Sequence, residues 1–414
     1  MPALLPRFAG HGPLLSGLVV TRLIGWGTTF YSPSVLVQAF DRELGLNAEI
    51  VFGGITVLLI TGALVAPAIG RRLDRHGTRG TMCLGAVICA LGFVLLAAVQ
   101  GPWSYLASWA VIGLGHAMSL ANVGNVTVAQ LMGDRTRRVI GLMMLVTGMA
   151  SSIFWPVTAF LTERYGWRDT VLVFAALQLL VVLPIYAMVP RHRGHAAGPS
   201  TPLAVAVPEA ADVAVMETGR VAACRRNQAF WLVALAFSAS GLVSWGLPLH
   251  LISLFQAGGL SPAEAVWVAT LSGPATIAAR AIDATVGDKL PAERVALIGL
   301  LLGPLCCVAL PLLPMTMSAA TGFIVVFSAA LGVISVARAT LPLALFGRRG
   351  FASMLGRLTV PQNIAFAAAP LLFAVLIERF GPSQTLAISA AIQFVGFFAM
   401  LALVRMLAQA EATQ

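Results

Sequence analysis

The sequence predicts an all-α membrane protein with twelve transmembrane helices in two six-helix bundles. Hydrophobic residues make up 58% of the 414-residue chain and charged residues only 10%, whereas a soluble domain is about a quarter charged. Twelve apolar runs are long enough to cross a bilayer, which takes about 20 residues each. Basic residues gather on alternate loops between these runs, as the positive-inside rule requires of a membrane protein.

The composition excludes several other classes of protein. The mean hydropathy of +0.89 is too high for a disordered chain, which is charged and poor in apolar residues. The 5 cysteines are an odd number without framework spacing, which excludes a small disulfide scaffold. The formal charge of +10 would suit nucleic acid. Because nearly all of it falls in short loops, we expect contact with anionic lipid and no nucleic-acid partner.

Six apolar runs in the N-terminal half are expected to form the first bundle, over residues 1–190. The first run continues past 25 residues without a small-residue cleavage site, which favours a membrane helix over a signal peptide. The six predicted helices cover residues 14–40, 50–69, 81–99, 103–131, 139–162 and 168–189.

Six further runs are expected to form a C-terminal bundle over residues 227–414. Between the two sets, residues 191–226 are rich in proline, glycine and charge and contain no run long enough to span, so we expect a cytoplasmic linker there. The six predicted helices cover residues 228–256, 263–287, 293–313, 319–346, 351–377 and 383–407.

The distribution of basic residues predicts the orientation. With the amino terminus inside, 19 of the 26 basic residues fall on the inner face, 4 on the outer face and 3 inside helices. Losing one helix would flip every later loop and destroy this bias. We therefore expect a multi-pass protein of a bacterial inner membrane with both termini in the cytoplasm.

The two halves resemble each other, which indicates an internal repeat. The matching segments are Glu163 to Gly166 with Glu378 to Gly381, Leu131 to Gly133 with Leu345 to Gly347, Gly141 with Gly356, and Trp26-Gly27 with Trp245-Gly246. All four matches occur in the same order and at nearly one offset. Six spans separate the copies, so both have the same orientation, and transporters with such parallel repeats bind substrate near the membrane midplane.

The loop between the second and third predicted helices carries a recognisable pattern. Residues 70–79 read GRRLDRHGTR, and this G-x-x-x-D-R-x-G-x-R pattern resembles the signature of the major facilitator superfamily. The span count and the repeat extend the resemblance along the whole chain. The resemblance implies the fold of that family, transport of small solutes by alternating access, and a cavity to which the first, eighth and tenth helices contribute.

The same loop is a candidate cytoplasmic gate. Its glycines would allow a tight turn, and its carboxylate could pair with an arginine or accept from a helix amino terminus. The alternative is a solvated basic loop that only sets topology. The proposed gate residues are Gly70, Asp74, Arg75, Gly77 and Arg79.

Three arginines lie within predicted membrane helices. Each would cost about 2.5–3.5 kcal/mol if it faced lipid, so we expect Arg22, Arg280 and Arg338 to face the protein interior. Asp283 lies three residues after Arg280 and can pair with it on one helix face. Positive charge without an acidic partner favours an anionic substrate. The alternative is that Arg22 and Arg338 extend toward the inner headgroups.

Polar and aromatic side chains on several predicted helices are further candidates for substrate contact. The first predicted helix is rich in glycine and contains Pro33, and broken first helices mark binding regions in transporters. Its stretch from Arg22 to Pro33 is loosely similar to a bacterial branch of the superfamily related to monocarboxylate and oxalate–formate carriers. The alternative for all of them is helix packing and hydrogen bonding between helices. The candidates are Trp26, Tyr31, Asn122, Asn125, Trp245, His250 and Asn363.

The sequence favours a secondary transporter over an enzyme. No P-loop is present, so ATP is not expected to drive transport directly, and no His/Cys cluster has metal spacing; we expect no cofactor. Asp283 and His116 are candidate coupling residues for protons, with a counter-substrate as the alternative. The expected cargo is a small organic anion. Two alternatives stay open: proton-coupled efflux of drugs or amphipathic compounds, and a membrane receptor that does not transport.

Overall fold

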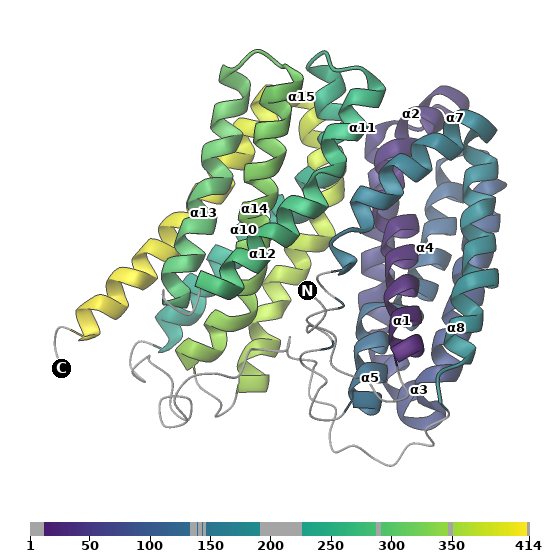
Figure 1. The fold of residues 1–414 in the computed structure, drawn as a ribbon, viewed down its shortest axis with the longest axis horizontal. Coiled ribbons are helices and arrows are strands. Elements are labelled where there is room, and N and C mark those ends of the chain that lie inside the picture. The colour runs from purple at the N-terminus through teal and green to yellow at the C-terminus, as the bar shows by residue number, and fades with distance from the viewer. Residues whose placement is uncertain are drawn as a thin grey trace. The chain divides into compact units, whose positions relative to one another are not determined.

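The computed structural model describes residues 12–132, 139, 143, 146–190, 226–286, 291–346 and 351–411, and these residues form helices and short connections without any strand (Figure 1). The chain divides into two compact units, Met1–Pro199 and Ser200–Gln414. The predicted linker lies outside the described residues except for Arg226. Most of residues 133–145, where the fifth predicted helix begins, lies outside them as well.

The first unit is built from the purple to blue helices of Figure 1. Helix α3 packs along α4 and against α7, and the core between them includes Met82, Met118, Phe154 and Tyr186. The helices are α1 (Gly12–Trp26), η1 (Gly27–Tyr31), α2 (Pro33–Leu44), α3 (Ala48–Ala97), α4 (Pro102–Ser119), α5 (Ala121–Met132), α7 (Ala150–Leu177), η3 (Gln178–Val182) and α8 (Leu183–Ala187).

The second unit is built from the green to yellow helices of Figure 1. Helix α10 packs along α15, and α13 packs against α14 and α15. The core between them includes Phe237, Leu300, Ile334 and Leu341. The helices are α10 (Arg226–Ala257), α11 (Pro262–Thr270), α12 (Ser272–Val286), α13 (Ala292–Ala309), η6 (Leu310–Leu312), α14 (Met317–Phe346) and α15 (Phe351–Glu411).

Three long helices bend at a glycine that adopts a left-handed φ. Such a φ is strained for any residue with a side chain. In each case the threonine four residues later donates its hydroxyl to the glycine carbonyl at the start of the following helical stretch. The pairs are Gly77 (φ 72) with Thr81 at 3.0 Å, Gly166 (φ 82) with Thr170 at 2.7 Å, and Gly381 (φ 79) with Thr385 at 2.8 Å.

These bends explain how the helices relate to the twelve predicted spans. Nine helical stretches of the described residues are long and apolar enough to cross a membrane. Two of them, Ala150–Ala187 and Arg357–Gln409, bend at Gly166 and Gly381 and each cover two predicted spans. The first predicted span is divided among α1, η1 and α2. The helical stretches are consistent with twelve membrane crossings, but the number twelve stays a prediction.

The internal repeat extends to side-chain packing. A Cβ on Gly27 would lie 2.1 Å from the ring of Phe154, and a Cβ on Gly246 would lie 2.2 Å from the ring of Phe373. The two glycines are separated by the same offset as the two phenylalanines, so the second contact is the first one repeated. Each unit therefore needs a glycine at this point because a phenyl ring fills the space where a side chain would begin.

Both units expose large apolar side chains. Leu64 and Trp103 of the first unit are 77% and 83% exposed, and Leu312 of the second is 78% exposed. Exposed apolar area of this extent is costly in water and suits the hydrocarbon of a bilayer, as expected for a membrane protein.

Candidate functional site

Arg22 is the buried cation of the first unit. It lies on α1, is 7% exposed, and donates from Nη1 to Asn125 Oδ1 on α5 at 2.8 Å. Its Nε is buried without a hydrogen-bond partner. No ion pair joins it to an acidic side chain among the described residues. A neutral amide therefore holds this guanidinium, and its charge has no protein counter-ion in the part of the chain that the structure describes.

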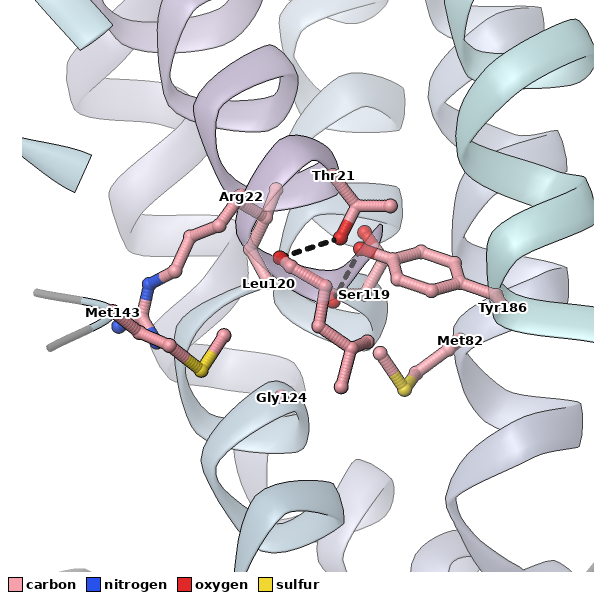
Figure 2. Close-up of a pocket in the computed structure, with 9 residues that line it drawn as sticks. Thr21, Arg22, Met82, Ser119, Leu120, Gly124, Met143 and Tyr186 are labelled. Carbon is pink, nitrogen blue, oxygen red and sulfur yellow. Dashed lines mark hydrogen bonds between the residues drawn. The ribbon is translucent and has the colours of Figure 1, made fainter. Parts of the chain in front are cut away.

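A pocket adjoins Arg22 within the first unit. Figure 2 shows the guanidinium at one side and the hydroxyls of Thr21 and Tyr186 at the other. The cavity volume is about 10 Å³, about the room that one buried water needs and far below the roughly 300–1,000 Å³ of sites for drug-sized ligands. Its lining residues are Leu18, Thr21, Arg22, Met82, Ser119, Leu120, Gly124, Met143 and Tyr186.

The hydroxyl groups of Thr21 and Tyr186 donate hydrogen bonds to backbone carbonyls. Thr21 donates to Leu18 O at 2.9 Å and Tyr186 donates to Ser119 O at 3.0 Å. A hydroxyl carries one hydrogen and two lone pairs. These two oxygens can therefore accept a further hydrogen bond, while Arg22 can only donate.

A π-helical turn follows α1 and carries a group of aromatic side chains. Such turns occur often at functional sites. The Trp26 ring meets the edges of Phe30 and His116, with ring centroids 5.6 and 5.4 Å apart. Tyr31 lies edge-on to Trp155 at 5.6 Å. The structure thus groups two predicted binding residues, Trp26 and Tyr31, and places one of them against the predicted coupling residue His116.

The hydrogen bonds around His116 fix its tautomer. Thr29 Oγ1 lies 2.7 Å from Gly25 O and must donate to it, because a carbonyl only accepts. Thr29 Oγ1 is also 3.0 Å from His116 Nδ1, so Nδ1 carries the hydrogen of this contact. The neutral imidazole therefore keeps the lone pair on Nε2, where a proton can be added.

Arg338 is a half-buried cation of the second unit. Its guanidinium carbon lies 5.1 Å from the centre of the Phe366 ring and 5.9 Å from that of Phe237, within the range of cation–π attraction. The Trp245 ring stacks on the Phe366 ring, with the ring centroids 4.9 Å apart and 10° between the planes. Arg338 Nε is buried without a hydrogen-bond partner, and no ion pair joins Arg338 to a described acidic residue.

The other predicted residues of the second unit have different surroundings. Arg280 donates from Nε to Ser335 Oγ on α14 at 3.1 Å, and its expected pair with Asp283 stays a prediction. His250 is buried and donates from Nε2 to Pro370 O at 3.1 Å, which anchors it to α15. Asn363 lies on α15 with an exposed side chain.

The predicted gate is described only in part. Asp74 and Arg75 lie in α3, but their side chains fall outside the described part of the chain, as does the side chain of Asn122. Gly77 makes the bend, as expected, whereas Gly70 is helical and a Cβ there would meet nothing within 4 Å. The expected turn at Gly70 is therefore wrong: one positive φ, at Gly77, suffices. Arg79 is half-buried.

Several site residues were not predicted from the sequence. Gly124 carries no chemistry, yet a Cβ there would meet nothing within 4 Å, so its missing side chain helps keep the pocket open. Phe237 and Phe366 look like ordinary apolar helix residues. The sequence does not show that Gly124 lies near Arg22 or that Phe237 and Phe366 lie near Arg338, because these contacts join residues far apart in the chain.

The residues that the structure describes contain no group of three histidine, cysteine, aspartate or glutamate side chains able to hold a metal ion. The described site is instead a set of cations, amides, hydroxyls and aromatic rings within each unit.

Comparison with known proteins places these features in a family. The model of the Major Facilitator Superfamily matches residues 17–361. An uncharacterized 38 kDa protein in the 23S RNA operon of Thermoproteus tenax is 28% identical over 40% of this chain and 43% of its own length. Monocarboxylate transporter 13 of Rattus norvegicus is 25% identical over 77% of this chain and 69% of its own length. Monocarboxylate transporter 14 of Homo sapiens is 27% identical over 34% of this chain and 27% of its own length. The chain thus spans less than half of the first of these relatives.

Solved structures show the same fold. A bacterial homologue of the human lysosomal transporter Spinster, inward-facing and unoccupied, matches with a TM-score of 0.73 at 14% identity, over 97% of this chain and 99% of that one. A mutant of the nucleoside transporter NupG matches with a TM-score of 0.74 at 12% identity, over 94% and 99%. The family model covers well over half of the chain, so the chain belongs to the major facilitator superfamily.

Proposed function

We propose that this transporter moves small organic anions by alternating access as a secondary active carrier. The observation that supports the proposal is the pair of arginines Arg22, which is buried, and Arg338, which is half-buried; neither has an acidic partner among the described residues. Two relatives are named monocarboxylate transporters, which agrees with a carboxylate cargo.

The energetic argument concerns the cost of a buried charge. A charge taken out of water without a counter-ion is expensive, and an arginine at the bilayer centre costs about 2.5–3.5 kcal/mol. An anion that binds beside the guanidinium supplies the missing partner. Arginine suits a carboxylate because its planar fork donates two parallel hydrogen bonds.

The remaining elements of the mechanism follow as proposals. The sequence lacks a P-loop, so a gradient of substrate, protons or a counter-substrate is the proposed energy source. His116 is the proposed proton carrier through the lone pair of Nε2, with Asp283 as a second coupling residue. The same proposal includes the boundaries of the two bundles and the cytoplasmic gate at residues 70–79. It also includes a location in the inner membrane with both termini in the cytoplasm.

The proposed function is tested by transport in proteoliposomes. Purified protein is reconstituted, and the uptake of labelled acetate, lactate, benzoate, glucose and a cationic dye is compared. Saturable uptake of the carboxylates, inhibited mutually and absent from empty liposomes, supports the proposal. Uptake of the dye alone contradicts it and favours efflux of amphipathic compounds.

A further inference from the structure

We infer that the break between α4 and α5 encloses one buried water molecule, held by the hydroxyl oxygens of Thr21, Ser119 and Tyr186. This assignment goes beyond the proposed function and does not depend on the cargo, because it concerns how a broken membrane helix is stabilised. Three features support it: the break itself, the size of the cavity beside it, and the hydrogen bonds of the oxygens that line the cavity.

The fourth predicted span is broken at a single residue. Leu120 alone separates α4 from α5, and its φ of −97° and ψ of −140° lie outside the helical region. The repeat matches Leu120 with Ile334, at the offset of Leu131 and Leu345, and α14 runs through Ile334 without interruption. The break is therefore a feature of the first unit and not of the repeat.

A small cavity lies beside this break. Leu120 and Gly124 both line it, and a Cβ on Gly124 would meet no atom within 4 Å. The cavity volume is about 10 Å³, which is about the room of one water and too little for an organic ligand. A broken helix also leaves backbone groups that side chains or water satisfy. Size and position therefore both suit a water molecule.

Three hydroxyl oxygens line the cavity, and each has given its hydrogen to a backbone carbonyl. Thr21 donates to Leu18 O at 2.9 Å, Tyr186 to Ser119 O at 3.0 Å, and Ser119 itself to Gly115 O at 2.8 Å. All three hydroxyl residues are 2% exposed, and Figure 2 shows them together at one side of the cavity. Each oxygen keeps lone pairs and has no further hydrogen to donate. A ligand between them therefore has to donate.

Water meets this requirement better than a metal ion does. Its two hydrogens can reach two of the hydroxyl oxygens, and its own oxygen can accept from the first amides of α5, which at any helix start lack partners within the helix. Sodium ions also bind neutral oxygens at broken helices in transporters. Arg22, however, lines the same cavity without an acidic partner among the described residues, and its charge repels a second cation.

The water connects three helices at the point where α4 ends. Thr21 belongs to α1, Ser119 to α4 and Tyr186 to α8. Because the same water also adjoins the start of α5, it takes the place of backbone hydrogen bonds that an unbroken fourth span would make. It thereby holds the two halves of this span in a fixed relative direction.

The experiment uses X-ray radiolysis of the full-length protein in detergent, which converts bound water into hydroxyl radicals that oxidise adjacent side chains. Met82 and Met143 line the cavity and are 1% and 3% exposed. Met118 and Met400 are as deeply buried, at 5% and 0% exposed, and do not line it. We expect mass spectrometry to show several-fold faster oxidation of the two cavity methionines than of the two controls.

Variants of the cavity locate the water. Gly124→Leu fills the cavity. Thr21→Val removes one acceptor at nearly constant shape, which keeps the test valid if the leucine variant does not fold. Both should lower the oxidation of the cavity methionines to that of the control methionines. Thr158→Val is the matched control, because the Thr158 hydroxyl is buried in the same unit but outside the cavity, and it should leave the oxidation unchanged.

Three results would overturn the assignment. Equal oxidation of all four methionines would show that no water is bound. Fast oxidation that persists in both Gly124→Leu and Thr21→Val would place the water elsewhere. A melting temperature that rises with sodium chloride but not with choline chloride, and does so only while Thr21 is present, would identify a sodium ion in place of the water.

Discussion

The two units accommodate the same feature, an arginine within a long apolar helix, in different ways. In the first, Arg22 on α1 is held by an amide beside an open pocket. In the second, Arg338 on α14 lies against two phenyl rings. The repeat matches Arg22 with Gly241 at the offset of the Trp-Gly pairs, and Gly124 with Arg338 at the offset of Leu131 and Leu345. The arginine and the glycine have exchanged places between the two units.

This exchange shows what a repeat preserves. The contacts of Gly27 with Phe154 and of Gly246 with Phe373 are the same in both units, so the helix packing is repeated. The polar chemistry is not. An amide consumes one guanidinium N–H, whereas a ring attracts the cation through its face and leaves the N–H groups, which lie in the guanidinium plane, to other acceptors.

The largest expected effect comes from removing the cation of the second unit. Arg338→Gln should lower kcat/KM for carboxylate uptake by about 10- to 150-fold, because a hydrogen bond to a charged group contributes about 1.5–3 kcal/mol. Uptake in proteoliposomes measures the change. Arg405→Gln, at an exposed arginine of the same unit, is the matched control. Equal uptake by both variants would remove Arg338 from the site.

The shared packing is tested by adding one methyl group. Gly27→Ala and Gly246→Ala should each destabilise the protein by about 1–3 kcal/mol through overpacking against a phenyl ring. Melting in detergent measures both, with Gly124→Ala expected to cause no loss. A loss in one unit and none in the other would show that the packing is not repeated.

The different contacts of the two arginines are tested by removing the neutral partner of each one. Asn125→Ala should raise the KM for carboxylates about five- to tenfold, because it removes the hydrogen bond that holds Arg22 within the described part of the chain. Phe366→Leu should have a smaller effect, about two- to fivefold, because cation–π attraction contributes about 0.5–2 kcal/mol and Phe237 remains. Initial uptake rates give both KM values. The reverse order would mean that the rings hold their arginine more firmly than the amide does.

The smallest expected effect concerns the repeated bends. Thr170→Val and Thr385→Val each remove one hydroxyl from a glycine carbonyl and should cost about 0.5–1.5 kcal/mol. Thermal melting should show two small and similar decreases. A large decrease for one of them would reveal a bend that depends on its threonine.

The helices and the repeat could be predicted from the sequence because long apolar runs and recurring Gly and Trp-Gly pairs are local patterns. Gly166 and Gly381 were matched in this way, and both make the expected helix end. Asn125 was selected as a polar residue, but its contact with Arg22 joins positions 103 residues apart, which spacing does not reveal. Phe366 was missed because an aromatic residue in an apolar helix gives no sign of whether it meets lipid or an arginine.

The π-helical turn from Gly27 to Tyr31 was missed for a related reason. At this turn Phe154 closely approaches Gly27 and Leu120 closely approaches Gly25, and such tertiary contacts cannot be read from the sequence. The predicted helix over residues 14–40 therefore contains a π-helical turn where the aromatic group gathers, with helical backbone angles at Trp26 and Ser32 on either side.

Anion binding by Arg22 and Arg338 is tested most directly by a cryo-electron-microscopy structure of the protein in a saturating carboxylate. We expect a carboxylate oxygen about 2.7–2.9 Å from a guanidinium nitrogen of Arg22 or Arg338. A bound carboxylate that touches neither arginine, with both still held by Asn125 and Phe366 alone, would contradict the proposed role of these two residues.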